Sequence, residues 1–221
     1  MLVSLTLFLP LAGFVIATIL NKIVNYKYSQ YITSIFVIFS SLFSWIIFFK
    51  ILNNSQIYKV YLFNWIHSGE FFVEWSLRVD ALTSVMLIVV TNISAAVHVY
   101  SIGYMKGDSS IPRFMGYLSL FTFFMLSLVT SDNLLQMFFG WEGVGLASYL
   151  LIGFWYHKKS ANDAAIKAFI LNRIGDFGFL LGIVGIFFVF NTIYFDEIFH
   201  QIEFFKNQNI NFLGLNVYNI Y

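Results

Sequence analysis

The 221-residue chain contains no cysteine, which excludes disulfides, thiolate metal sites and iron–sulfur clusters held by this chain. Charged residues are also scarce, at 10% of the sequence, whereas soluble domains carry about 25%. So few charges cannot cover a water-facing surface, and the mean hydropathy of +0.79 indicates that lipid is the main solvent. A net charge of only +1 argues against a nucleic-acid partner.

The sequence also lacks the motifs of soluble enzymes. It shows no phosphate-binding loop, no nucleophile triad and no cluster of metal ligands, and its glycine-rich runs follow no predicted strand. The first 20 residues lack the basic start and the small-residue cleavage site of a signal peptide. We therefore interpret them as a membrane helix.

Long apolar stretches predict an all-α membrane protein with about six transmembrane helices. At 1.5 Å per residue, each stretch is long enough to cross the ~30 Å hydrocarbon core of a bilayer. Only Ser131 and Asp132 separate the fourth stretch from the fifth, so we expect these two helices to be antiparallel neighbours. The stretches are Leu2–Leu20, Tyr31–Leu52, Val79–Tyr104, Phe114–Thr130, Asn133–Phe154 and Ile166–Phe190.

Two further segments are too polar to span, which divides the chain into a membrane bundle (1–191) and two extramembrane parts. Residues 53–78 alternate apolar and polar side chains around His67-Ser68-Gly69, a pattern that predicts a small hairpin on the membrane surface. In 192–221, Phe195, Ile198, Phe199 and Ile202 recur at helical spacing, which predicts an interfacial amphipathic helix.

Lysine and arginine in the connections predict the orientation in the membrane. Six of these cations follow the first, third and fifth stretches and four lie on the opposite side, so we expect the N-terminus and the tail to be outside. The first set comprises Lys22, Lys27, Lys106, Arg113, Lys158 and Lys159, and the second comprises Lys50, Lys59, Arg78 and Lys206.

Glu142 lies near the middle of the fifth stretch, where a carboxylate costs roughly 2.5–3.5 kcal/mol on insertion scales. Such a residue indicates ion or proton handling, and the alternative is a static buried hydrogen bond. Gly140, Gly143 and Ala147 form a ridge of small residues on the same helix, which predicts close packing against a neighbour.

The sixth stretch carries Asp176 near its middle, with Arg173 one turn earlier. An intrahelical ion pair between them would neutralise both charges. Lys167, nearer the helix start, either faces loop water or reaches Glu142 from the adjacent helix. A glycine ridge opposite Asp176 predicts packing on two sides and an interior position for the carboxylate; it comprises Gly175, Gly178, Gly182 and Gly185.

A polar stripe follows one face of the third stretch, and it suits either a hydrated path or a buried seam between helices. Asp80, at its start, could instead be an interfacial helix cap. His98, near its end, either snorkels to the interface or carries protons, because imidazole changes charge near neutral pH. The stripe comprises Asp80, Thr83, Ser84, Thr91, Ser94 and His98.

These residues stand in longer runs that resemble chain 5 of the proton-pumping NADH:ubiquinone oxidoreductases (respiratory complex I). The resemblance rests on SLRVDALTSVMLIVVTNISAAVHVYSIGYM, NLLQMFFGWEGVGLASYLLIGFW and AAIKAFILNRIGDFGFLLGI, in that order. It implies an antiporter-like subunit whose two inverted repeats each hold a broken helix. It also implies relay roles for Glu142, Asp176 and His98. As a separate hypothesis, we expect Lys167 and Arg173 to tune the charge of Glu142 and Asp176.

The family implies that this chain binds no cofactor or metal, because other subunits of the complex hold NADH, FMN, the iron–sulfur clusters and ubiquinone. It also implies that a lysine on a seventh helix pairs with Glu142. The sequence stops at Tyr221, before that helix, so we expect a split or truncated subunit and a second chain with the remaining helices. Alone, Glu142 would be an unpaired buried acid.

Two other functions remain open at this point: a fragment of a multisubunit cation/proton antiporter, and a structural or assembly subunit without its own proton path. The abundance of phenylalanine, tyrosine, isoleucine and asparagine suggests an organellar coding sequence. We therefore expect the mitochondrial inner membrane, with a bacterial plasma membrane as the alternative.

Overall fold

The computed structural model describes residues 1–18, 26–54, 56–69, 71–205, 210–212 and 215–217. Six apolar helices form most of it: α1 (Leu2–Thr18), α2 (Tyr26–Asn54), α3 (Ala81–Tyr104), α4 (Ile111–Val129), α5 (Leu134–Ile152) and α6 (Lys159–Phe190). The remaining elements are β1 (Tyr58–Ser68), β2 (Phe71–Val79), α7 (Phe195–Phe205), β3 (Ile210–Phe212) and β4 (Leu215–Val217).

Each predicted membrane stretch coincides over most of its length with one of these helices, which confirms the all-α membrane class; residues 19 and 20 of the first stretch lie outside the described residues. Within the described residues, α2 to α6 are long and apolar enough to cross a bilayer, and α1 is a shorter apolar helix of 17 residues. The helices α2 and α6 begin several residues earlier than predicted. Their first turns carry polar side chains, which hydropathy leaves out but which do not interrupt backbone hydrogen bonding.

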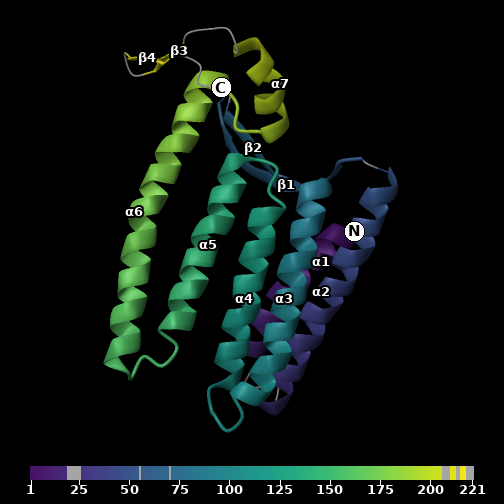
Figure 1. Cartoon of the computed structure of the whole chain (residues 1–221), viewed down its shortest axis with the longest axis vertical. Helices are drawn as coiled ribbons and strands as arrows, with labels where there is room; N and C mark the ends of the chain where they lie inside the picture. The colour runs from purple at the N-terminus through teal and green to yellow at the C-terminus, as the bar shows by residue number, and fades with distance from the viewer. Residues whose placement is uncertain (19–25, 55, 70, 206–209, 213–214, 218–221) are drawn as a thin grey trace.

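The helices alternate in direction, and α6 lies beside α5 at one edge of the bundle (Figure 1). The connections α3–α4 and α5–α6 lie at one end, whereas the hairpin and α7 lie at the other. This arrangement agrees with the predicted alternation, while the orientation relative to a membrane stays a prediction. Lys22 and Lys206 and the side chain of Lys27 lie outside the described residues.

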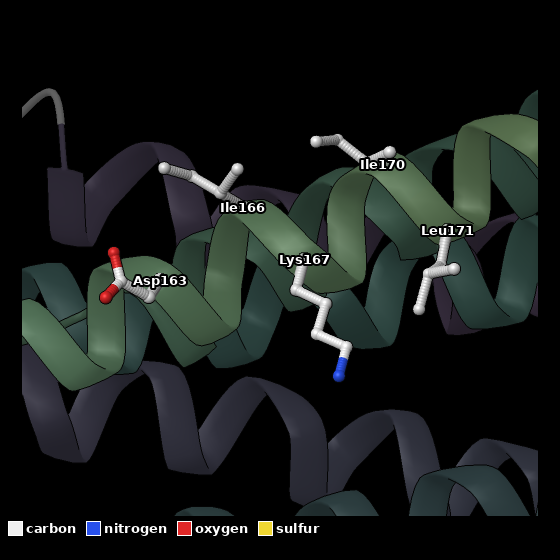
Figure 2. Close-up of a pocket in the computed structure, with 5 residues that line it drawn as sticks. All are labelled: Asp163, Ile166, Lys167, Ile170 and Leu171. Atoms are coloured by element: carbon white, nitrogen blue, oxygen red, sulfur yellow. The ribbon is translucent and has the colours of Figure 1, made fainter.

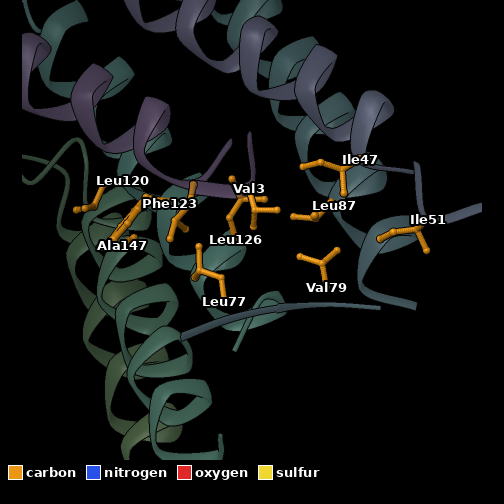
Figure 3. Packing of buried hydrophobic residues seen from close by; sticks show 11 residues of the cluster. Val3, Ile47, Ile51, Leu77, Val79, Leu87, Leu120, Phe123, Leu126 and Ala147 are labelled. Atoms are coloured by element: carbon orange, nitrogen blue, oxygen red, sulfur yellow. The ribbon is translucent and has the colours of Figure 1, made fainter. Parts of the chain in front are cut away.

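The main core lies where α1, α2, α3 and α4 meet the base of the hairpin (Figure 3). Its side chains come from all four helices, from β2 and from α5, so burial of these apolar groups holds the hairpin against the bundle. The buried residues are Val3, Leu7, Ile47, Ile51, Leu77, Val79, Leu87, Leu120, Phe123, Leu126 and Ala147.

The polar stripe of α3 is a seam between helices rather than a lipid-facing surface. Thr91 is buried and its hydroxyl lies 2.8 Å from that of Ser44 on α2. Asp80 is the N-cap of α3, and its carboxylate accepts a hydrogen bond of 2.8 Å from the backbone N–H of Thr83. The structure thus supports the cap interpretation of Asp80.

The predicted hairpin is present as the antiparallel pair β1–β2, with Gly69 in its turn. Gly69 has φ +60°, a conformation that side chains disfavour. Trp75 of β2 is buried against α5, with its ring centroid 4.8 Å from that of Phe139. Aromatic contacts therefore seat the hairpin on the helices.

The predicted amphipathic helix is α7, and the buried side chain of Ile198 packs it into a second apolar cluster with Val73, Leu134, Ile183 and Ile193. Its position at a membrane interface stays a prediction. In the rest of the tail, residues 206–209, 213–214 and 218–221 lie outside the described residues.

The small-residue ridge of α5 packs closely against the antiparallel α4, as predicted. A Cβ atom at Gly140 would lie 2.6 Å from the backbone nitrogen of Leu128, and one at Gly143 would overlap the ring of Phe124. Ala147 is fully buried. These contacts fix the distance between α4 and α5 at the level of Glu142.

We predict that Gly143→Leu prevents α4 and α5 from packing. The added side chain would enter the volume of the Phe124 ring, and overpacking costs typically 1–3 kcal/mol or more. Levels of the folded chain in membranes, measured by quantitative immunoblot after mild detergent extraction, should fall severalfold. Gly103→Leu, at an open position on α3, is the matched control, and equal levels of both variants would contradict this packing account.

Candidate functional site

Glu142 and Arg173 form an ion pair between α5 and α6, near the middle of both helices. The guanidinium nitrogen Nη1 of Arg173 donates to both carboxylate oxygens of Glu142, at 2.7 and 2.6 Å. The side chain of Glu142 is 22% exposed and that of Arg173 is 54% exposed. Glu142 is therefore not the unpaired acid that the sequence analysis expected, because its counter-charge lies within this chain.

Asp176 lies beside this pair on the face of α6 that contacts α5. Its side chain is 7% exposed and accepts a hydrogen bond of 2.8 Å from the indole nitrogen of Trp141. Arg173 Nη1 lies 3.8 Å from the second oxygen of Asp176. The intrahelical pair considered from the sequence is thus secondary, and the short contacts of Arg173 go to Glu142.

Together, Glu142, Arg173 and Asp176 form what we call the carboxylate cluster. It holds two carboxylates around one guanidinium, a net charge of −1 when both acids are ionised. A proton on either acid would make it neutral, and in a low-dielectric environment a unit of charge has a large energetic effect. The arrangement can therefore take up and release one proton while Arg173 keeps a carboxylate partner.

The outer face of α6 contradicts the expectation that this helix packs on two sides. Within the described residues, nothing lies within 4 Å of a Cβ placed at Gly175, Gly178 or Gly182. Asp176 is buried because α5 covers it, and the glycines on the other side make no such contact. The predicted interior position of Asp176 is therefore present, whereas the predicted packing on the opposite face is absent at Gly175, Gly178 and Gly182 within the described residues.

Lys167 is exposed on α6, and Figure 2 shows its ammonium extending away from the helix. The surrounding surface groove contains Asp163, Ile166, Ile170 and Leu171, all from the same helix. Lys167 forms no ion pair within the part of the chain that the structure describes. Of its two predicted positions, the structure favours the exposed one.

His98 is fully buried in a separate hydroxyl network between α3 and α4. Its Nδ1 lies 2.8 Å from the carbonyl oxygen of Ser94, and its Nε2 lies 3.1 Å from the hydroxyl of Ser119. Ser94 also shares a hydrogen bond with Thr122. Within the described residues no hydrogen bond or ion pair joins this network to the carboxylate cluster, so the site residues form two groups.

A third polar group, which the sequence analysis did not recognise, lies outside the spans. The Lys59 ammonium contacts Asp132 at 3.0 Å and Asp196 at 2.8 Å, and Arg78 contacts Asp196 at 3.0 Å. We call Lys59, Arg78, Asp132 and Asp196 the ionic clasp. Asp132 appeared in the sequence only as a separator of two helices, although its position between two apolar spans was a usable signal.

The ionic clasp shifts the pKa values of Lys59 and Asp196 in opposite directions. Burial lowers the pKa of Lys59, but hydrogen bonds and charge attraction from Asp196 and Asp132 outweigh it and raise the pKa above its usual range. The hydrogen bond from Lys59 holds the pKa of Asp196 below its usual range, against the opposing effect of burial. Both shifts favour the ionised pairs.

The fold resembles membrane subunits of known complexes. The chain superposes on a subunit of the membrane-bound sulfane sulfur reductase, an archaeal respiratory membrane complex, with a TM-score of 0.77 and 16% identity, over 89% of this chain and 39% of that one. It superposes on a chain of the Mrp complex from Dietzia sp. DQ12-45-1b with a TM-score of 0.75 and 22% identity, over 90% of this chain and 21% of that one. At these identities the similarity shows the fold alone.

Two family models match separate parts of the sequence. Residues 65–115 match the N-terminus of chain 5 of NADH-ubiquinone oxidoreductase (complex I). Residues 131–218, which include the carboxylate cluster, match the transmembrane domain shared by NADH:quinone oxidoreductases and Mrp antiporters. The matches therefore cover the end of β1, β2, α3, the start of α4, and α5 to α7.

Sequence relatives extend this similarity over almost the whole chain. NADH-ubiquinone oxidoreductase chain 5 of Chondrus crispus is 50% identical over 214 residues, which are 97% of this chain and 32% of that protein. NADH-quinone oxidoreductase subunit L of Rickettsia felis is 48% identical over 219 residues, 99% of this chain and 34% of that protein. The chain spans about a third of these relatives, and it belongs to the chain 5 (subunit L) family of NADH:quinone oxidoreductases, whose N-terminal portion it matches.

Proposed function

We propose that this chain is the N-terminal part of a proton-translocating membrane subunit of an NADH:quinone oxidoreductase. The observation that carries the proposal is the carboxylate cluster, two acids sharing one guanidinium at mid-span. Ionised groups at this depth are costly and mark ion or proton routes. The family of the chain agrees with this chemistry.

The proposed step is an exchange of partners by Arg173. In the structure its Nη1 is 2.6 Å from Glu142 and 3.8 Å from Asp176, so about 1 Å of movement changes its preferred carboxylate. When Glu142 binds a proton, its attraction for Arg173 falls and the guanidinium moves toward Asp176. When Glu142 releases the proton, the original pair forms again. No electron moves in this chain during the step.

The His98 network is the second proton-carrying group in this proposal. Its imidazole lies between a backbone carbonyl and the Ser119 hydroxyl, an arrangement that suits proton transfer through hydroxyl groups. The distance between α3 and α6 requires water or further side chains between the two groups. Lys167 acts only through its charge, because it is exposed and forms no ion pair within the described residues.

We further propose that the partners are other subunits of respiratory complex I, which hold NADH, FMN, the iron–sulfur clusters and ubiquinone. The remaining two-thirds of the relatives' length, whether on this polypeptide or a second chain, would supply the lysine that faces Glu142 and cover the open face of α6. The amino-acid bias favours the mitochondrial inner membrane, and relatives occur in both eukaryotes and bacteria.

Cation/proton exchange is the second candidate function. It is favoured by the similarity of the fold to a chain of the Mrp complex and by the family description that includes Mrp antiporters. The carboxylate cluster does not discriminate, because carboxylates suit both protons and sodium. Sodium transport without NADH oxidation by the native complex would favour this alternative.

We predict that Glu142→Gln leaves assembly intact and impairs proton translocation. Glutamine keeps the size and can accept a hydrogen bond from Arg173, but it cannot take up a proton. The measurement is the proton-to-electron ratio of the assembled complex in vesicles, with Asp163→Asn, an exposed carboxylate on α6, as the control. An unchanged ratio in a fully assembled Glu142→Gln complex would leave only a structural role for this chain.

We predict that Arg173→Met lowers the rate of proton translocation at least tenfold, which corresponds to about 1.4 kcal/mol. Removing the guanidinium leaves two adjacent carboxylates without a cation, whereas Arg173→Lys keeps the charge and should retain more activity. Lys159→Met, an exposed cation at the start of α6, is the matched control. Equal rates for the methionine and lysine variants would contradict a role for the charge of Arg173.

A further inference from the structure

The ionic clasp joins the β1–β2 hairpin, the α4–α5 turn and α7, which are three segments far apart in the sequence. Lys59 comes from β1, Arg78 from the end of β2, Asp132 from the α4–α5 turn and Asp196 from α7. The Asp132 carboxylate is buried, with 6% of its side chain exposed, and also accepts a hydrogen bond of 3.0 Å from Ser76. The Lys59 ammonium, at the centre, contacts both carboxylates.

Backbone hydrogen bonds connect the same segments as these ion pairs. The N–H of Leu134, at the start of α5, donates to the carbonyl of Ile193, just after α6, at 3.0 Å. The N–H of Arg78 donates to the carbonyl of Thr130 at 2.9 Å, and Asn133 forms a β-bridge with Tyr194. The clasp therefore lies where the end of α6 is connected to the start of α5.

Within the described part of the chain, α6 is held from one side, through α5, by aromatic contacts such as Phe138–Phe179 and by the carboxylate cluster. Its buried residues there are Ala165, Asp176 and Ile183, and nothing lies within 4 Å of a Cβ placed on its other side at Gly175, Gly178 or Gly182. The clasp therefore adds a restraint at the end of a helix that is packed on one face. Ala165 lies near the start of α6, away from the clasp. Asp176 lies at mid-span, and Ile183 lies nearer the end of α6 that is close to the clasp. A shift at the clasp would therefore change the α5–α6 distance at the carboxylate cluster.

We propose that the ionic clasp is a positioning device: it sets the separation of α5 and α6 at the Glu142–Arg173 pair, with Lys59 as its central positioning residue. The relevance to proton transfer rests on the proposed function, but the positioning itself does not. Asp132 restrains the start of α5, and Asp196 restrains α7 and with it the end of α6. Lys59, on strand β1 of the hairpin, contacts both carboxylates and so links the start of α5 to α7.

The Lys59–Asp196 pair of the clasp stays ionised over a wide pH range. Asp196 loses its charge only as the pH falls through a pKa already below the usual range, and Lys59 loses its charge only as the pH rises through a pKa already above it. The other titratable groups that face it are Asp80, Glu74, Tyr194, Glu197 and His200. We therefore expect a constant positioning role around neutral pH.

The absence of cysteine makes the test direct, because introduced cysteines are the only labelling sites. Spin labels at Leu146→Cys on α5 and Leu181→Cys on α6, both exposed positions, report the helix separation by double electron–electron resonance in lipid nanodiscs. The full chain gives one narrow distance distribution. Lys59→Met is expected to broaden or shift it, and Lys59→Arg is expected to restore it.

Lys106→Met, which removes an exposed cation at the opposite end of the bundle, is the matched control and should match the wild-type distribution. If Lys59→Met leaves the distribution unchanged, the proposal is overturned. Should Lys59→Met fail to fold, as judged by its helical circular dichroism, Asp196→Asn carries the test, because the Lys59–Asp132 pair remains. An unchanged distribution for Asp196→Asn would then overturn it. Normal proton pumping by Glu142→Gln would instead refute the proposed function and leave this result standing.

Discussion

The charge balance between Glu142, Arg173 and Asp176 is the constraint on which the centre of this molecule depends. Two carboxylates and a guanidinium at mid-span are costly in lipid, and they are stabilised by one another, by the indole of Trp141 and by the ring of Phe169 under Arg173. The close packing of α4 on α5 and the restraint of α6 at the ionic clasp both serve this geometry. The glycine contacts of α5 keep Glu142 at a fixed depth and angle, and the clasp keeps Arg173 within reach.

Polar groups are sorted by depth and by helix pair. Hydroxyls line the α2–α3 and α3–α4 seams, where they form hydrogen bonds with one another and with His98, while the ion pair at mid-span lies at the α5–α6 contact. Ion pairs outside the spans lie at the end of the bundle that carries the hairpin and α7. The α2–α3 and α3–α4 seams therefore contain neutral hydroxyl groups. The edge of the bundle at α6 is charged, and it is packed on one face within the described residues. That edge is the part of the structure most able to move with protonation.

Much of the fold could be predicted from the sequence because lipid imposes simple rules. Apolar length located the spans, alternation around Gly69 predicted the hairpin, and helical spacing predicted α7. Because Gly140 and Gly143 carry no side chain, α4 approaches the backbone of α5 closely there, as a ridge of small residues predicts. The predicted starts of α2 and α6 were less accurate, because the first turns of these helices are polar and hydropathy does not detect them.

The candidate site was only partly predictable. The sequence identified Glu142, Arg173 and Asp176, and spacing along one helix raised a pair between Arg173 and Asp176 as one possibility, whereas the structure pairs Arg173 with Glu142. Contacts between helices depend on their relative rotation, which hydropathy does not specify. The same reason explains the missed clasp: Lys59 and Asp196 are 137 positions apart by their numbering, and only the folded chain brings them together. The glycine ridge of α6 was predicted to pack, but at Gly175, Gly178 and Gly182 it is open within the described residues.

The most direct test of the central claim is infrared difference spectroscopy of the complex that contains this chain, recorded between the resting state and turnover. If Glu142 takes up and releases a proton as Arg173 changes partner, a carboxylic acid C=O band appears during turnover in the native chain and is absent in the glutamine variant. If the carboxylate of Glu142 stays ionised throughout turnover, no such band depends on this residue. The Glu142–Arg173 pair would then be a static structural contact.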